Sequence, residues 1–184
     1  MEIVDTAIPA VKVLTPKKFG DHRGFFSETY NKKTLATAGI NLDFVQDNHS
    51  LSAERGVIRG LHFQLEPFGQ DKLVRVTRGR IFDVAVDLRR SSKTYGHHVA
   101  VELSAENWKQ LLVPIGFAHG FVTLEPNTEV IYKVTNYYSP QHDRGLFWND
   151  PALGINWPIA PGEAVLSDKD KVQPRLADLP SAFA

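Results

Sequence analysis

Short runs in which apolar and polar residues alternate recur along most of the chain. This period of two is typical of β-strands that bury one face. Gly, Pro, Asn and Asp collect between the runs and indicate that the chain reverses direction there. The expected strands are residues 11–14, 25–30, 44–50, 56–64, 73–76, 81–88, 99–103, 110–113, 121–124 and 129–134.

The segments between these strands predict how neighbouring strands meet. Residues 77–80, which contain Gly79, predict a hairpin between the strands on either side. Residues 104–107 likewise separate two strands that are expected to pair, and residues 125–128 form a turn by composition. Many short strands at even spacing, with hardly any helical pattern, predict a mainly β fold: an antiparallel barrel of the jelly-roll type with a few short helices.

Few positions favour helix. Asn31 is typical of a helix N-cap, with residues 32–38 as the helix and Gly39 as its end. From Asp150 on, the chain is richer in Pro and Gly and is expected to wrap the surface, with residues 167–170 capping one more short helix. We expect one domain, residues 1–184, because no repeat, low-complexity tract or linker divides the chain.

The predicted strand at residues 56–64 carries ionisable groups in a pattern that otherwise indicates burial. Alternation places His62 on the same face as Ile58 and Gln64, and this face is expected to point inward. Glycines on both sides of Arg59 remove side chains where another group, such as a ligand, approaches the backbone. Considered alone, His62 would be a core histidine with a satisfied hydrogen bond, and Arg59 would belong to a structural ion pair.

Two further titrating side chains follow the same alternation. Lys72 lies in phase with Val74, and Tyr132 lies in phase with Val130, so both are expected inside the barrel with His62. Alone, Lys72 would lie along the rim with its ammonium group in water, and Tyr132 would be a core tyrosine bonded to the backbone. Three converging polar groups instead indicate a site.

The composition excludes several classes of protein. Of the 184 residues, 21 are Lys or Arg and 21 are Asp or Glu, so the formal net charge is zero and neither nucleic acid nor a membrane is an expected partner. The absence of cysteine excludes disulfides and fits a reducing compartment. The N-terminus lacks a signal-peptide pattern, and no apolar segment approaches the ~20 residues of a membrane helix, so a cytoplasmic protein is expected.

Residues 114–120 are expected to form a tight loop that carries a second histidine, His119. They resemble the second motif of cupins, in which this histidine joins an earlier His-x-His and a glutamate as metal ligands. Here Gln64 occupies the place of the second histidine after His62, and Glu66 is wrongly spaced. Two histidines without further ligands make a poor transition-metal site, so we expect a cupin-like barrel without a metal.

Nearly the whole chain resembles the dTDP-4-dehydrorhamnose 3,5-epimerase family. Six motifs occur in the family's order, and no single one carries the resemblance. They are residues 19–26, 44–50, 59–62, 114–120, 136–139 and 146–150.

The resemblance implies an isomerase that converts dTDP-4-dehydro-6-deoxy-D-glucose to dTDP-4-dehydro-L-rhamnose, in dTDP-L-rhamnose biosynthesis. Inversion occurs at C3 and C5, which flank the C4 ketone, so each proton becomes acidic if the enolate is stabilised. The family pattern makes His62 the base, oriented by Asp170 rather than Asp168, and Tyr132 the acid on the opposite face of the sugar. Lys72 is expected to stabilise the oxyanion at C4, and no metal or redox cofactor is implied.

The resemblance also implies a substrate-binding set, in which arginines and aromatic stacking hold the nucleotide. At the position of Asp143 the family commonly has glutamate. Family members are homodimers that contribute an N-terminal strand to the partner, so Arg23 or Glu28 could serve the neighbouring subunit's site. The implied substrate-binding residues are Arg23, Glu28, Gln46, Asp47, Asn48, Arg59, Lys72, His119, Tyr138, Asp143 and Lys169.

Three alternatives remain open from the sequence. A relative that acts only at C3 or only at C5, or on a different dTDP-sugar in antibiotic biosynthesis, could lack the tyrosine acid, and the presence of Tyr132 favours the double epimerase. A metal-dependent cupin enzyme is disfavoured by Gln64. A non-catalytic sugar-binding cupin is disfavoured by the combination of His62, Lys72 and Tyr132.

Overall fold

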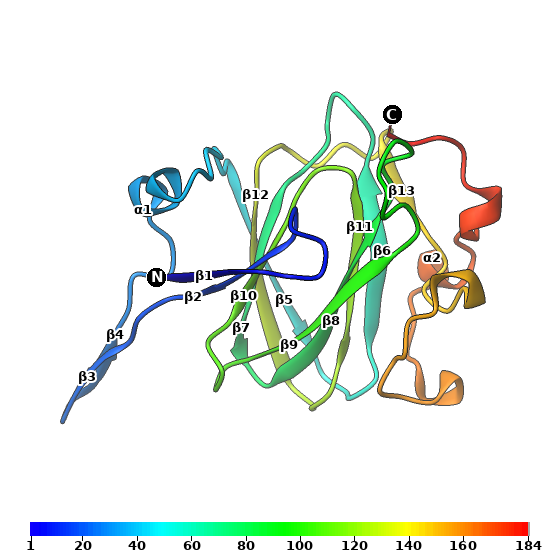
Figure 1. The fold of residues 1–184 in the computed structure, drawn as a ribbon. Coiled ribbons are helices and arrows are strands. Elements are labelled where there is room, and N and C mark those ends of the chain that lie inside the picture. Colours follow the sequence, from blue (N-terminus) through cyan, green and yellow to red (C-terminus); the bar gives the residue numbers. More distant parts are fainter. Residues whose placement is uncertain (184) are drawn as a thin grey trace.

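The computed structural model, which describes residues 1–183, contains two facing β-sheets that form a flattened barrel (Figure 1). All pairings between the strands of these two sheets are antiparallel. The six-stranded sheet has the order β1 (Glu2–Asp5), β2 (Lys12–Thr15), β10 (Gln110–Val113), β7 (Lys72–Arg78), β12 (Thr128–Val134) and β5 (Gln46–Ser52). The five-stranded sheet has the order β13 (Asp143–Gly145), β6 (Ile58–Gln64), β11 (Phe117–Thr123), β8 (Arg80–Asp87) and β9 (His98–Ser104). The predicted mainly β, jelly-roll architecture is confirmed.

The predicted pairings of consecutive strands are wrong. β7 and β8 lie in different sheets, as do β9 and β10, so the turns between them carry the chain from one sheet to the facing one. At the first of these crossings Gly79 has φ +75°, and a Cβ there would lie 2.3 Å from the Thr128 hydroxyl oxygen. Turn composition predicts a reversal of the chain, whereas the partner of each strand depends on which faces are buried together.

The two largest apolar clusters pack against the two faces of the five-stranded sheet. The first fills the space between the two sheets. Its buried members include Val11, Val74, Val76, Ile81, Ala85, Leu111, Val113, Phe117, Phe121 and Val130. The second lies on the outer face of the five-stranded sheet, under the C-terminal segment, and includes Leu61, Phe63, Val84, Val86, Leu146, Leu153 and Leu179.

A bulge in β6 changes which residues face the interior. His62 pairs with His119 and Arg59 pairs with Phe121, so two residues of β6 lie opposite one residue of β11. At the bulge, Gly60 has φ +128°, and a Cβ there would lie 2.5 Å from the Cα of Gly120. The expectation that His62 and Ile58 share a face is therefore wrong: Ile58 packs outside, in a cluster with Trp148 and Ile159. The backbone of His119 and Gly120 in β11 therefore approaches Gly60 closely.

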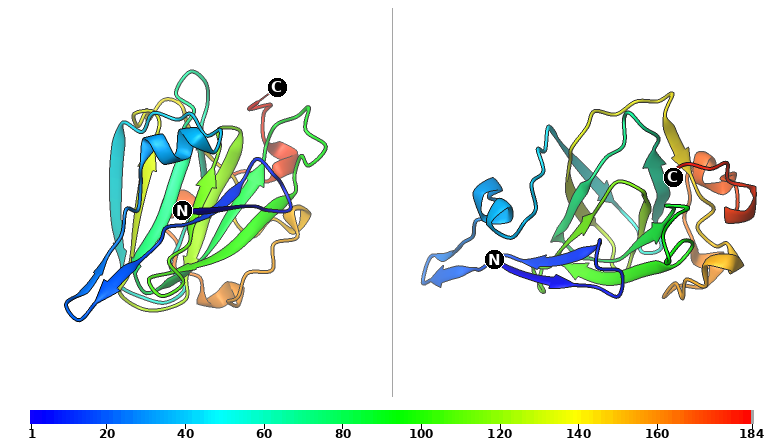
Figure 2. Two further views of the ribbon diagram at one scale, coloured as in Figure 1. Left: turned by 60° about the vertical axis from the view of Figure 1, so that its left-hand side comes forward. Right: turned by 45° about the horizontal axis from the view of Figure 1, so that its top comes forward.

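The N-terminal region forms a two-stranded hairpin, β3 (Phe19–Asp21) and β4 (Gly24–Phe26), which projects away from the barrel (Figures 1 and 2). The strand expected at residues 25–30 is therefore shorter, since β4 ends at Phe26. Helix α1 (Lys32–Thr37) follows, with the Asn31 side chain accepting a hydrogen bond from the Thr34 N–H. This confirms the predicted N-cap.

The C-terminal segment wraps the outside of the five-stranded sheet (Figure 1). Ser167 caps α2, which confirms the predicted short helix. The helical elements of this segment are η1 (Pro151–Leu153), η2 (Pro161–Glu163), α2 (Asp168–Lys171) and η3 (Leu176–Asp178). Among residues 1–183, no helix has the length and apolar character needed to span a membrane.

Candidate active site

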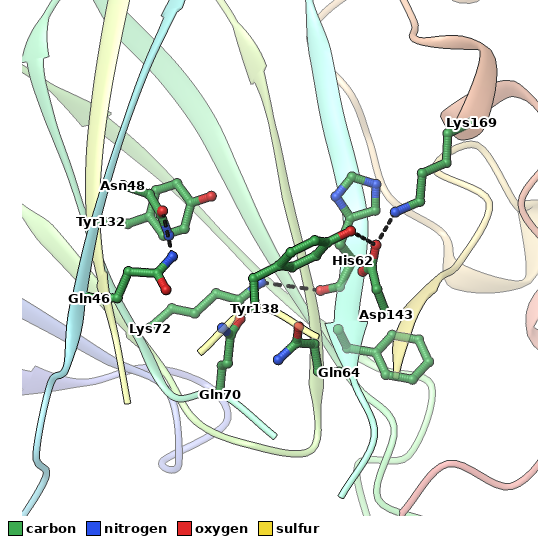
Figure 3. A pocket seen from close by; sticks show the side chains of 11 residues that line it. Gln46, Asn48, His62, Gln64, Gln70, Lys72, Tyr132, Tyr138, Asp143 and Lys169 are labelled. Carbon is green, nitrogen blue, oxygen red and sulfur yellow. Dashed lines mark hydrogen bonds and ion pairs between the residues drawn. The ribbon is translucent and has the colours of Figure 1, made fainter. Parts of the chain in front are cut away.

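A cavity of about 390 Å³ opens at one end of the barrel, between the two sheets (Figure 3). Both sheets and the C-terminal segment contribute side chains to its wall. The lining residues are Gln46, Asn48, His62, Phe63, Gln64, Gln70, Lys72, Tyr132, Tyr138, Asp143 and Lys169. The three titrating residues predicted to converge, His62, Lys72 and Tyr132, therefore line one cavity.

His62 is paired with a buried carboxylate. Its Nε2 lies 2.5 Å from Oδ1 of Asp170, which is 3% exposed on α2. The Ser167 hydroxyl donates to the other carboxylate oxygen of Asp170 at 2.9 Å. Burial opposes ionisation of Asp170, but the hydrogen bonds and charge of His62, together with Ser167, outweigh it and lower the pKa of Asp170. An ionised Asp170 accepts the Nε2 proton and leaves Nδ1 of His62 free to accept a proton.

Lys72 is a buried ammonium group beside this pair. Its Nζ lies 3.4 Å from the backbone carbonyl of His62. Burial lowers the pKa of Lys72 from 10.5 to about 8, although the negative charges of Asp143 and Asp83 partly offset that effect. Lys72 thus keeps a proton near neutral pH in a place where its charge is poorly screened.

Tyr132 enters the cavity from β12, in the sheet facing His62 (Figure 3). Burial raises the pKa of its phenol, while the positive charge of Arg59 opposes the shift. The phenol therefore stays protonated at neutral pH. The Arg59 guanidinium itself donates to the Leu51 carbonyl and the Ser52 hydroxyl of β5.

Five more of the predicted binding residues line the mouth of the cavity. Gln46 Nε2 donates to Asn48 Oδ1 at 2.8 Å. On the other side, Asp143 accepts a hydrogen bond from the Tyr138 hydroxyl at 3.3 Å and forms an ion pair with Lys169. The mouth therefore offers amides, a cation and an exposed aromatic ring.

Five of the predicted binding residues do not line this cavity, and Arg59, whose hydrogen bonds are given above, is one of them. Arg23 and Glu28 lie in or just after the projecting hairpin, where Arg23 pairs with Asp21 and Glu28 accepts a hydrogen bond from Asn31. Two others point elsewhere. Asp47 lines a second cavity of about 200 Å³ and pairs with Lys133, and His119 is buried with its Nε2 2.6 Å from Asp83.

His119 does not occupy a loop, as the sequence predicted. The turn ends at Gly116, and His119 lies within β11 between β6 and β8. The apolar residues around this histidine continue the strand, because Phe117 and Phe121 both face the core between the sheets. The resemblance to a cupin loop motif concealed that alternation.

Gln64 and Gln70 both line the cavity, although neither was predicted as a site residue. The alternation that placed Gln64 on the face of His62 was the available signal for it. Gln70 lies in the segment between β6 and β7, where no periodic pattern exists. Asp83, the buried partner of His119, was also missed.

Within residues 1–183, no three His, Cys, Asp or Glu side chains are grouped as ligands of one metal ion. His62 and His119 each engage an aspartate instead. The arrangement suits proton transfer: a histidine oriented by a carboxylate, a protonated phenol from the facing sheet and a buried cation.

Comparison with known proteins agrees with this geometry. A family model described as dTDP-4-dehydrorhamnose 3,5-epimerase matches residues 5–178. The Sinorhizobium fredii protein of that name is 58% identical over 177 residues, which cover 96% of this chain and 90% of the relative.

Two crystal structures are similar over nearly the whole chain. A Bacillus anthracis dTDP-4-dehydrorhamnose 3,5-epimerase with TDP and PPi bound has a TM-score of 0.92 and 54% identity, covering 95% of this chain and 99% of its own. A Legionella pneumophila dTDP-6-deoxy-D-glucose-3,5-epimerase in complex with dTDP-4-keto-L-rhamnose has a TM-score of 0.93 and 43% identity, covering 97% and 94%.

Proposed function

The chain belongs to the dTDP-4-dehydrorhamnose 3,5-epimerase family, and from this membership we propose how its own residues carry out the reaction. The enzyme is an isomerase that inverts C3 and C5 of dTDP-4-dehydro-6-deoxy-D-glucose in dTDP-L-rhamnose biosynthesis. The observation that carries the residue assignment is the His62–Asp170 pair, which faces Tyr132 across a cavity that also holds Lys72.

His62 is the base in this proposal. Each proton to be removed lies next to the C4 ketone, so its loss gives an enolate. Asp170 holds His62 through Nε2, which leaves Nδ1 to accept the proton. Positioned acid–base groups contribute ~10²–10⁴-fold each, so the base alone does not account for the rate.

Lys72 stabilises the enolate. Its buried ammonium group would lie against the developing negative charge on the C4 oxygen, and a fixed charge in a poorly screened cavity stabilises that charge more than water does.

Tyr132 returns a proton. It projects from the sheet opposite His62, as delivery to the other face of the ring requires, and its pKa is raised, so its proton is present at neutral pH.

The cavity mouth binds the nucleotide part of the substrate in this proposal. Gln46, Asn48 and Lys169 offer polar or charged groups there, and the exposed Tyr138 ring offers a flat surface for the base. The guanidinium of Arg59, whose charge acts on the phenol of Tyr132, would bind a phosphate. The ligands in the two related crystal structures, TDP and dTDP-4-keto-L-rhamnose, are of the same class. Asp143, where the family commonly has glutamate, contributes by holding Lys169 and Tyr138.

Asp47 and His119 act indirectly, because their side chains engage Lys133 and Asp83. Arg23 and Glu28 serve the partner's site in a homodimer. The projecting hairpin that carries Arg23 leaves Phe19, Phe25 and Phe26 more than half exposed, as expected for a surface that a second chain covers. The barrel and the C-terminal segment form one domain. The enzyme has no cysteine and works in the cytoplasm.

The test is proton exchange at the two carbons. The protein is incubated with dTDP-4-dehydro-6-deoxy-D-glucose in deuterated water without added metal, and C3 and C5 are followed by proton NMR. We expect deuterium at both carbons, and at neither with His62→Ala. Deuterium at one carbon only would identify a single-site epimerase. An inactive folded protein that recovers with added metal would overturn the acid–base assignment.

A further inference from the structure

The side chain of Gln64 makes three hydrogen bonds to the backbone of two other segments. Its Nε2 donates to the carbonyls of Phe68 at 2.6 Å and Tyr137 at 3.1 Å, and its Oε1 accepts from the N–H of Ser139 at 2.7 Å. The residue is 4% exposed. A glutamine amide has two N–H donors, so both are used here. Rotating the amide end for end would set its oxygen against two carbonyls, so the partners fix its orientation.

These bonds bracket Tyr138. The Tyr137 carbonyl and the Ser139 N–H belong to the peptide groups on either side of it. The Tyr138 side chain itself is 58% exposed and reaches across the cavity, where its hydroxyl donates to Asp143 (Figure 3). An exposed ring without buried contacts would be free to move. Here the backbone beneath the ring is anchored on both sides by one buried side chain.

We propose that Gln64 is a positioning residue, which holds residues 137–139 so that the Tyr138 ring forms a fixed wall for the base of the nucleotide. The inference rests on the proposed function, in which Tyr138 binds that base. A ring that is ordered before the ligand arrives lowers the entropic cost of binding. Loss of the Gln64 amide therefore weakens binding of the nucleotide. The chemical step is spared, because the Gln64 side chain bonds to Phe68, Tyr137 and Ser139.

The test variant is Gln64→Met, which keeps the length of the side chain and removes its amide. We expect the KM for the dTDP-sugar and the Kd for dTDP to rise about tenfold, with kcat changed less than about twofold. The KM and kcat come from initial rates, and the Kd from calorimetric titration. A fall in kcat at unchanged KM would overturn the proposal.

A double-mutant cycle separates positioning from a general structural effect. Tyr138→Ala removes the ring, so adding Gln64→Met to Tyr138→Ala should raise the Kd for dTDP little further. Effects that add in full would show that Gln64 does not act through Tyr138 and would overturn the inference.

A matched control lies at the C-terminal end of β11, the strand that pairs with β6. Thr123 is fully buried and makes two side-chain hydrogen bonds to backbone, with Val57 and Glu54. Thr123→Val should lower the melting temperature yet leave the KM unchanged. If Gln64→Met does not fold, Gln64→Glu keeps the acceptor, loses both donated bonds and carries the same expectations. Deuterium exchange by the unmodified enzyme tests the proposed function separately, so failure of that function and failure of this inference are distinguishable.

Discussion

Two aspartates in one short helix have opposite surroundings. Asp170 is buried and bonded to His62 and Ser167, whereas the Asp168 side chain is 99% exposed and pairs only with Lys171. Asp170→Asn keeps the volume but loses the carboxylate that orients His62, so kcat should fall about 100-fold or more. Asp168→Asn should leave kcat unchanged, since an exposed ion pair contributes little. Equal effects of the two substitutions in a steady-state assay would refute the assignment of Asp170.

Lys72 predicts an alkaline limit for activity. Burial lowers its pKa to about 8, and the proposed role requires the charged form, which is lost as the pH rises through that value. The kcat/KM should therefore be highest below about pH 8 and decline above it. The phenol of Tyr132 does not account for this limit, because burial raises its pKa from 10. Initial rates between pH 6 and 10 measure the profile.

Lys72→Arg supplies the control for this profile. Arginine stays charged throughout the range, so the variant should be slower but should show no decline near pH 8. If the decline persisted in Lys72→Arg, another group would be responsible for it.

At the scale of elements, α2 serves to hold Asp170. Ser167 caps the helix by accepting from the Asp170 N–H at 3.2 Å and also donates to the Asp170 carboxylate. Ser167→Ala removes both bonds, at a cost of about 1 kcal/mol to the local structure. We expect kcat to fall about 3- to 10-fold, with Ser167→Thr restoring most of it. A loss that threonine does not rescue would show that the hydroxyl is not the cause.

The positions of most strands could be predicted from the sequence, but their partners could not. Alternation located Gln110–Val113 with the bounds that the structure has, because both the apolar pattern and the flanking turns are local. The assignment of β7 and β8 to different sheets depends on contacts across the whole barrel. The bulge at Gly60 arises from the close approach of Gly120, which no local pattern reveals.

The residues of the site likewise differ in how far the sequence could predict their positions. Alternation predicted that Lys72 and Tyr132 face the interior, because each lies in a strand with a regular period of two. Asp170 is 108 residues from His62 in the sequence, so only the family resemblance joined the two. Gln64 was visible as an inward residue, but its partners belong to segments whose placement follows from the tertiary fold.

At the scale of the whole molecule, the barrel of a single chain does not explain the role of the projecting hairpin. It carries Arg23, an expected substrate-binding residue, away from the cavity of its own chain (Figure 2). In a two-fold symmetric dimer, a segment that leaves one subunit can complete the site of the other. Each site would then combine His62 of one chain with Arg23 of its partner.

Mixed dimers test this arrangement. Chains with Arg23→Ala and chains with His62→Ala are co-expressed with different affinity tags and purified through both. Each variant alone should be nearly inactive at low substrate concentration. If the hairpin crosses over, one site of the mixed dimer carries both lesions and the other carries none, so about half of the unmodified activity should return. If Arg23 serves its own chain, each site keeps one lesion and no activity returns.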